Sequence, residues 1–201
     1  MKTLHSLPFL AALALCGCQT VQSTRPVGDK VADLKPAIWN AKWQDGTGAI
    51  LRSEIKDARL GIVKLTPIAP KPKPGDPKAM ELLVRTLGDY TIINTNEMKP
   101  PGIKSAPADP YDFARVALDD THLVIFAPNA PTFVTLIKQQ RIAGKLERDK
   151  HGKPTGSCTV KELSEHDFQR LKKEGLETQT LFNEDPYAVY VRYSWKLFWG
   201  L

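Results

Sequence analysis

Short apolar segments separated by turn-forming residues restrict the fold of this chain more than any other feature of its sequence. Asp45-Gly46 lies between two such segments, and Gly88-Asp89 lies between two more. A turn of this kind between strand-like segments is typical of a β-hairpin. A third hairpin is expected around residues 119–121. The segments that we interpret as strands are 37–43, 49–56, 58–65, 80–87, 90–94, 111–118 and 122–127.

Residues near the C-terminal end of the sequence add another strand, because they alternate between two faces with a period of two. Tyr190 and Arg192 belong to one face. The opposite face carries Val189, Val191, Tyr193, Trp195 and Leu197. Together the segments predict a mainly β fold, either an antiparallel barrel or a strongly curved sheet, of about eight strands. These strands are short and charged, whereas membrane-spanning strands need about 9 to 11 residues and an apolar row.

Two short α-helices interrupt the strands. Asn129 precedes Ala130-Pro131 as an N-cap, and an apolar stripe then continues until the helix ends before Gly144. Ser164 begins the second helix, and Gly175 ends it. Residues 145–149 and 156–162 between the helices are expected to pair as a hairpin. We expect both helices to pack on the sheet rather than to form a separate domain.

The first 18 residues have the pattern of an export signal. Lys2 precedes an apolar run over 4–15 that is too short for a permanent membrane-spanning helix. The run closes with Leu15-Cys16-Gly17-Cys18, which resembles the signal of bacterial lipoproteins. The resemblance implies that Cys18 receives diacylglycerol, because the small Gly17 precedes it, whereas the bulky Leu15 precedes Cys16. Lipidation of Cys16 and an ordinary secretory signal are the alternatives.

The lipoprotein resemblance also implies a location. Acyl chains on Cys18 would anchor the chain to a membrane, since each buried CH₂ contributes about 0.8 kcal/mol. In lipoproteins of this kind an aspartate after the cysteine commonly signals retention in the inner membrane, and here that place holds Gln19. The resemblance therefore implies an outer-membrane anchor that faces the periplasm. In that oxidising compartment we expect the lone thiol of Cys158 to be buried in a strand.

The sequence predicts three parts. Residues 1–17 are expected to form the signal peptide, residues 18–35 the lipidated cysteine with a flexible tether, and residues 36–201 a single β-rich domain. A total of 201 residues with 42% hydrophobic content fits one globular domain. Three cysteines cannot hold together a disulfide scaffold.

A second resemblance covers roughly residues 38–195. It consists of a Trp-containing first strand followed by the segment 57–63, the strand at Tyr111 with its partner 123–129, a helix ending at 142–145, and Cys158-Thr159-Val160 before the last helix. This order is similar to that of small bacterial lipoproteins of uncharacterised function with a lipocalin-like barrel. The resemblance implies a fold and a location, and it carries over no catalytic residue.

Two functions outside enzymology follow from these patterns. The first is a binding module whose barrel holds an apolar or amphiphilic molecule. Its expected contacts are Tyr190, Tyr193, Trp195 and Trp199. The second is a protein-interaction lipoprotein, either an envelope-assembly accessory or an immunity factor against a periplasmic toxin. For that function the contacts would be Lys71 and Lys73, which alternate with prolines in the segment 67–77.

Other chemistry has little support in the sequence. His122, His151 and His166 stand at no spacing typical of metal ligation, so we expect neither a metal nor another cofactor. We expect no enzyme, although an envelope enzyme is the third alternative. The formal charge of +6 is compatible with nucleic acid, but an exported chain would not meet that partner.

Overall fold

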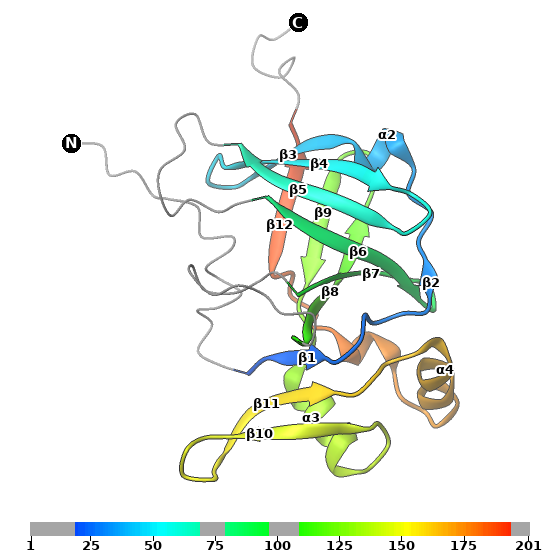
Figure 1. Cartoon of the computed structure of the whole chain (residues 1–201), viewed down its shortest axis with the longest axis vertical. Helices are drawn as coiled ribbons and strands as arrows, with labels where there is room; N and C mark the ends of the chain where they lie inside the picture. The colour runs from blue at the N-terminus through cyan, green and yellow to red at the C-terminus, as the bar shows by residue number, and fades with distance from the viewer. Residues whose placement is uncertain (1–18, 69–78, 97–108, 194–201) are drawn as a thin grey trace, which may run out of the picture.

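The computed structural model describes residues 19–68, 79–96 and 109–193, and the strands in this part form one sheet that closes on itself (Figure 1). The strands are β1 (Val21–Ser23), β2 (Lys30–Val31), β3 (Ala41–Asp45), β4 (Ile50–Asp57), β5 (Ile62–Ile68), β6 (Met80–Leu87), β7 (Tyr90–Thr95), β8 (Tyr111–Leu118), β9 (His122–Phe126), β10 (Gly144–Arg148), β11 (Pro154–Val160) and β12 (Ala188–Arg192). The helices are α2 (Pro36–Trp39), α3 (Ala130–Lys138), α4 (Glu165–Lys173) and the 3₁₀-helix η1 (Thr178–Leu181).

Eight strands form a closed antiparallel barrel. They follow one another in the order β8-β7-β6-β5-β4-β3-β12-β9, and β9 returns to pair with β8. The closing register joins Arg115 to Phe126 and Leu118 to Leu123. Closure pairs the edges that an open sheet would expose. The predicted antiparallel barrel of about eight strands with two short helices is therefore confirmed.

The hairpin turns form where the sequence predicted them. Asp45 Oδ1 accepts hydrogen bonds from the N–H groups of Thr47 (2.8 Å) and Ala49 (2.9 Å) and closes the β3–β4 turn. Gly88 in the β6–β7 turn has a φ of +57°. A Cβ at Gly88 would also lie 2.4 Å from the ring of Phe168. Glycine is therefore required here by both the backbone conformation and the packing of α4.

One face of each barrel strand fills the interior. Two neighbouring clusters make up this barrel core, whose buried members include Trp39, Trp43, Leu51, Val63, Leu65, Leu82, Val84, Val116, Leu123, Ile125 and Tyr190. The indole of Trp43 donates to Ser53 Oγ at 2.9 Å, and Ser53 donates in turn to the carbonyl of Trp39. The polar atoms of these two side chains and the Trp39 carbonyl are therefore paired inside the barrel.

A second hydrophobic core, the outer core, lies on the outer face of the same strands. Ala114 and Val116 of β8 belong to the barrel core, whereas Phe113, which precedes them on the opposite face of the strand, belongs to the outer core. β10, β11, α3 and α4 cover this face and lie together below the barrel in Figure 1. The buried residues that these elements bring to the outer core include Phe133, Leu136, Cys158, Val160, Phe168 and Leu171.

Aromatic rings connect the outer core to the barrel strands. Tyr90 of β7 meets Phe168 at 5.9 Å and Phe182 at 6.0 Å between ring centroids. Phe113 of β8 meets Phe133 at 5.8 Å and Phe182 at 6.5 Å. All four pairs have the edge-to-face arrangement that aromatic quadrupoles favour. The rings therefore form one continuous chain from α4 to α3.

The sheet divides at β8. Tyr111 and Asp112 at its start pair with β1, whereas residues 115–118 pair with β9 and close the barrel. β1 also runs parallel to β11, and β11 pairs with β10. One branch of the sheet thus completes the barrel, and the other covers the outer core.

The prediction of a flexible tether over residues 18–35 is wrong for residues 19–34. Val27 is 0% exposed and Leu34 is 6% exposed. The backbone N–H of Val27 donates to Asn94 Oδ1 at 2.6 Å, and the Asn94 amide donates to the Val27 carbonyl at 3.2 Å. The buried residues of the segment divide between the two cores: Val21 and Val27 belong to the outer core, and Ala32 and Leu34 belong to the barrel core. The local sequence of the segment resembles that of a linker although the segment is folded.

The two predicted helices begin at their predicted N-caps, but two predicted element boundaries need correction. Asn129 is the predicted N-cap and accepts from the N–H of Thr132 at 3.3 Å. Ser164 precedes the second helix, as predicted, and forms a capping box with Asp167. α3 ends at Lys138, well before Gly144, because Gln140 takes the left-handed conformation (φ +57°) that terminates a helix. Gly144 instead begins β10. The expected strand 37–43 opens with the single turn α2, so β3 starts only at Ala41.

Candidate functional site

The interior of the barrel is the expected place for an apolar ligand. The cavity found there measures about 10 Å³ and is lined by Trp39, Trp43, Ser53, Leu65, Leu82, Ile93, Val116, Leu118, Leu123 and Ile125. One water molecule needs about 10–15 Å³, and ligand pockets commonly measure about 300–1,000 Å³. In the part of the chain that the structure describes, side chains fill the barrel and leave no room for such a ligand.

Tyr190, predicted as a ligand contact, belongs to the barrel core. It is 2% exposed and packs in the same cluster as Trp43. Burial raises the pKa of its phenol, with Asp45 adding to the effect, so the group stays neutral. In β12, Tyr190 therefore points inward, and the valines on either side of it point outward.

The outward residues of β12 belong to a row that we call the apolar strip: Ala117, Val124, Val189 and Val191. Ala117 pairs with Val124, and Val124 pairs with Val189, so these side chains share one face across β8, β9 and β12. Val189 is 43% exposed and Val191 is 48% exposed. Scattered apolar residues are normal on a surface, but a contiguous row is typical of a contact site.

Polar residues border the apolar strip. Val191 lies between His122 of β9 and Gln44 of β3 in the register. Tyr193, a predicted contact residue, follows Val191 in the same alternation and is half-buried. Its backbone N–H donates to the carbonyl of Lys42 at 2.8 Å. A small apolar centre with a polar border is the composition of a protein contact surface.

The β8–β9 turn beside the strip brings a carboxylate, a hydroxyl and an imidazole together. Asp119 Oδ1 accepts from the Thr121 hydroxyl, the Thr121 N–H and the His122 N–H, each at 2.7 Å. These hydrogen bonds, from Thr121 first, lower the pKa of Asp119 to about 2. The carboxylate is therefore ionised and caps the turn, which is the usual role of aspartate in such a sequence.

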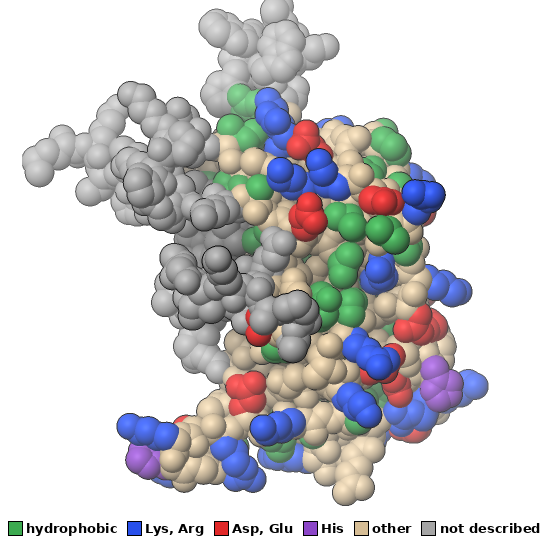
Figure 2. Space-filling view, viewed as in Figure 1, with side chains coloured by type: hydrophobic (Ala, Val, Ile, Leu, Met, Phe, Trp, Pro, Cys, Tyr) green, Lys and Arg blue, Asp and Glu red, His purple; other side chains and the backbone are tan. Residues whose placement is uncertain are grey.

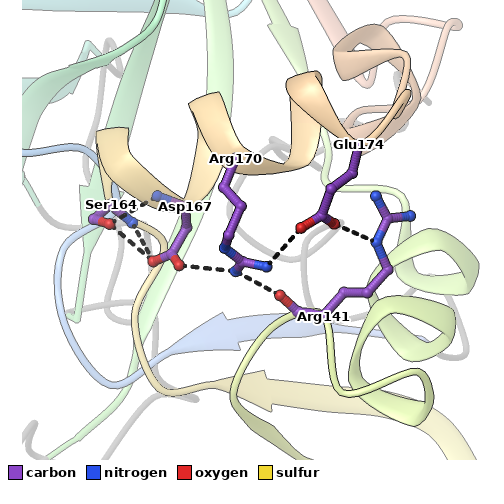
Figure 3. A network of polar contacts seen from close by, with 5 residues as sticks. All are labelled: Arg141, Ser164, Asp167, Arg170 and Glu174. Atoms are coloured by element: carbon purple, nitrogen blue, oxygen red, sulfur yellow. Dashed lines mark hydrogen bonds and ion pairs between the residues drawn. The ribbon is translucent and has the colours of Figure 1, made fainter.

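A polar network, the α3–α4 clamp, holds α4 against the segment after α3 (Figure 3). Arg170 donates to Asp167 at 3.1 Å, to Glu174 at 3.4 Å and to the carbonyl of Arg141 at 2.6 Å. Arg141 Nε donates to Glu174 at 2.9 Å. The hydrogen bond from Arg141 lowers the pKa of Glu174. Burial opposes ionisation of Asp167, but bonds from Ser164 and Arg170 outweigh it and lower its pKa. The clamp connects α4 to the segment that follows α3.

A second hollow, of about 130 Å³, lies beside β6 and β7. Its lining consists of Ile62, Glu81, Leu82, Leu83, Asn94, Thr95, Asn96 and Tyr111. The Asn94 amide in this hollow is held by Val27 and by the carbonyl of Leu83 at 3.2 Å. Its hydrogen-bonding capacity therefore serves to fix the N-terminal segment on β7.

Groups for metal or thiol chemistry are not assembled in the described residues. In residues 19–68, 79–96 and 109–193, no three His, Cys, Asp or Glu side chains are grouped to hold a metal ion. Cys158 is buried, as predicted. Burial, with a contribution from Glu147, raises the pKa of its thiol to about 11, so the nucleophilic thiolate is scarce at neutral pH. No helix in the described part is long and apolar enough to cross a membrane.

The other predicted site residues lie outside the described residues. They are Cys18, Lys71, Lys73, Trp195 and Trp199. The apolar strip was not predicted from the sequence, although the alternation over β8 and β9 places Ala117 and Val124 on the face opposite Val116 and Ile125. That alternation was the available signal.

Comparison with family models, with curated proteins and with solved structures finds no match to this chain. The resemblances to lipoprotein signals and to lipocalin-like lipoproteins therefore stay predictions. The chemistry of the described residues is the remaining basis for a function.

Proposed function

We propose that this chain is a lipoprotein of the cell envelope, anchored through Cys18 to the outer membrane and facing the periplasm, that binds another envelope protein and performs no catalysis. The observation that carries the binding proposal is the filled barrel. A barrel with an internal cavity of about 10 Å³ has only its surface to offer a partner, since a ligand-binding barrel needs a much larger space.

The apolar strip supports a protein as that partner. All three strands that carry it are paired on both sides within the barrel, so a partner cannot add a strand there and must contact side chains. Val189 and Val191 offer apolar area without a deep pocket. Such a surface fits a flat protein face better than a small molecule, and its small size favours a transient complex.

Two kinds of protein fit this role, an envelope-assembly factor and a periplasmic toxin. Site-specific photo-crosslinking in intact cells tests the proposal and identifies the partner. A photoreactive residue at Val189 should give a discrete adduct with one protein. The matched position Glu54, which is exposed on the outer face of β4, should give none.

A charge in the strip provides a second test. Val191→Asp should abolish the adduct formed at Val189, because a partner would have to desolvate the carboxylate. Thermal unfolding should change little, since Val191 is already 48% exposed. Equal crosslinking from Val189 and Glu54, or an adduct that survives Val191→Asp, would contradict the strip as the contact. A small molecule co-purifying in native mass spectrometry would contradict the protein partner.

The anchor has its own experiment. Metabolic labelling with an alkyne fatty acid should mark the wild-type chain and fail in Cys18→Ala, whereas Cys16→Ala should label normally. Full labelling of Cys18→Ala with loss in Cys16→Ala would move the anchor to Cys16. If the wild-type chain and both variants stay unlabelled, the chain carries no lipid and the ordinary secretory signal is the explanation.

A further inference from the structure

The first described residues are fixed to β11. The N–H of Thr20 donates to Ser157 Oγ at 2.9 Å, and the N–H of Cys158 donates to the Thr20 carbonyl at 2.9 Å. A Cβ at Gly156 would lie 2.7 Å from the side chain of Gln19. Gln19 alone separates Cys18 from Thr20 in the sequence. The backbone N–H and carbonyl of Thr20 are both hydrogen-bonded to β11.

This short connection limits the distance between the sheet and a membrane that holds lipid on Cys18. Two residues span at most about 7 Å, because each extended residue covers 3.3–3.6 Å. That distance is smaller than the Debye length of about 8 Å at physiological ionic strength. Charges close to Thr20 and Ser157 would therefore experience the surface potential of the membrane.

The β10–β11 hairpin, to which Ser157 belongs, is mainly basic. The β10–β11 hairpin carries Lys145, Arg148, Lys150 and Lys153, all exposed, and His151 lies at its tip. Figure 2 shows the blue and purple side chains gathered over this hairpin at the lower left of the molecule. β1 runs parallel to β11, with Val21 opposite Cys158. The start of β1 thus lies on the side of β11 from which the hairpin tip extends.

The two acidic residues of the hairpin already have partners. Asp149 Oδ1 accepts from the N–H groups of His151 at 2.8 Å and Lys153 at 2.9 Å. Glu147 accepts from the Thr159 hydroxyl at 3.3 Å. Arg148 Nη1 donates to the carbonyl of Gly152 at 2.7 Å and closes the tip. The tip is therefore a braced turn that presents its lysines to the surroundings.

We infer that the basic tip of the β10–β11 hairpin rests on anionic phospholipid headgroups of the membrane that holds Cys18, as a second contact beside the lipid anchor. This inference rests on the anchoring part of the proposed function. Ammonium and guanidinium groups within a Debye length of anionic lipids are attracted to them. The contact fixes an orientation in addition to a position, because two separate points hold the fold.

The orientation leaves the apolar strip accessible. β1 pairs with Asp112 near the start of β8, whereas Ala117 lies five residues further along that strand, about 16 Å at 3.3 Å per residue. The end of β8 that is held near the membrane is therefore not the end that carries the strip. A partner in the periplasm can approach the strip while the hairpin stays on the lipid.

Lysine reactivity in reconstituted membranes tests this inference. The acylated chain is inserted from outside into phosphatidylethanolamine vesicles, with or without about 30% phosphatidylglycerol as the anionic lipid. A membrane-impermeant amine reagent then labels the lysines, and mass spectrometry gives each rate. Lys150 and Lys153 should react about fivefold more slowly in anionic vesicles, since each basic residue near such a surface gains about that factor. Lys42 and Lys56 on the barrel are internal controls and should not change.

Salt and two matched variants complete the experiment. The protection should vanish at about 1 M salt, where the Debye length is about 3 Å. K150Q/K153Q should lose the protection of Lys145, whereas K42Q/K56Q, which removes the same charge from the barrel, should retain it. Equal reactivity of all lysines in both vesicle types would overturn the inference while the anchor stands. An intact mass without acyl chains would instead refute the anchor and the inference together.

Discussion

The barrel core and the outer core use opposite faces of the same strands, but they are built in different ways. The barrel core takes alternate residues from eight strands that pair with one another around a closed circle. The outer core takes Phe113 and Ile92 from β8 and β7 and covers them with α3, α4 and residues of the N-terminal segment. Strand pairing around the closed barrel stabilises the barrel core. Side-chain packing between distant segments stabilises the outer core.

This difference assigns separate tasks to the two cores. The barrel core is filled, so it gives a rigid body with an accessible outer surface. The outer core fixes β1, the first described strand, against β11 and β8. In the proposed function the outer core therefore connects the membrane anchor to the barrel, and the barrel presents the apolar strip.

The largest expected loss of stability in the outer core comes from Phe133→Ala. Phe133 is 0% exposed and packs edge to face on Phe113, so its loss should cost about 3–5 kcal/mol of unfolding free energy. Hydrogen exchange should show faster exchange in α3, β10 and β11 than in β4 and β5. Leu82→Ala, inside the barrel, should cost about 2–5 kcal/mol and accelerate exchange in the barrel strands. Identical exchange patterns in the two variants would show that the two cores unfold as one unit.

A smaller effect is expected from Ser53→Ala in the barrel core. This change leaves the Trp43 indole without its acceptor and the Trp39 carbonyl without its donor. Buried groups left unsatisfied cost about 1–3 kcal/mol, which denaturant unfolding would measure. The control is Thr135→Ala on α3, whose exposed hydroxyl bonds only the Pro131 carbonyl of its own helix and should cost less than about 0.5 kcal/mol. Equal costs would mean that the Ser53 bonds add no stability.

The smallest expected effect is the acid response of the α3–α4 clamp. Folding lowers the pKa values of Glu174 and Asp167, so their contribution to stability is present above the ordinary values of 4.5 and 3.8. It is lost as the pH falls through those values toward the lowered ones. The protection factors of the α4 amides, which are corrected for the intrinsic exchange rate at each pH, should therefore fall below about pH 4.5 while those of β4 and β5 stay constant. In Glu174→Gln this fall should be smaller, and an unchanged acid response would exclude Glu174 as its source.

Local signals in the sequence were sufficient for much of the fold. The turn at Gly88, the N-cap at Asn129 and the capping box at Ser164 each act within a few residues, so the sequence alone locates them. The period of two predicted the strands, and β6 and β8 have the predicted boundaries. The burial of Cys158 followed from its strand-like surroundings.

The candidate site was harder to predict than the fold. In β12, Val189, Tyr190 and Val191 are all apolar or aromatic, so alternation defines two faces but does not say which one is inside. The space beside Trp43 decides this, because it accepts the ring of Tyr190 and leaves the valines on the surface. The alternation in β8 and β9 marks Ala117 and Val124, but only the register of β8, β9 and β12 places them beside Val189.

The sequence by itself determined the strand segments, the turns, the caps and the lipoprotein-like motif, because each depends on residues close together in the chain. Only the tertiary structure decided that the barrel is filled, that Tyr190 is inside it, and that residues 19–34 are folded. These outcomes depend on contacts over long sequence separations, such as the separation of 137 positions from Thr20 to Ser157. In these cases burial depends on the volume and the partners that distant segments supply, and the local patterns around these residues do not contain that information.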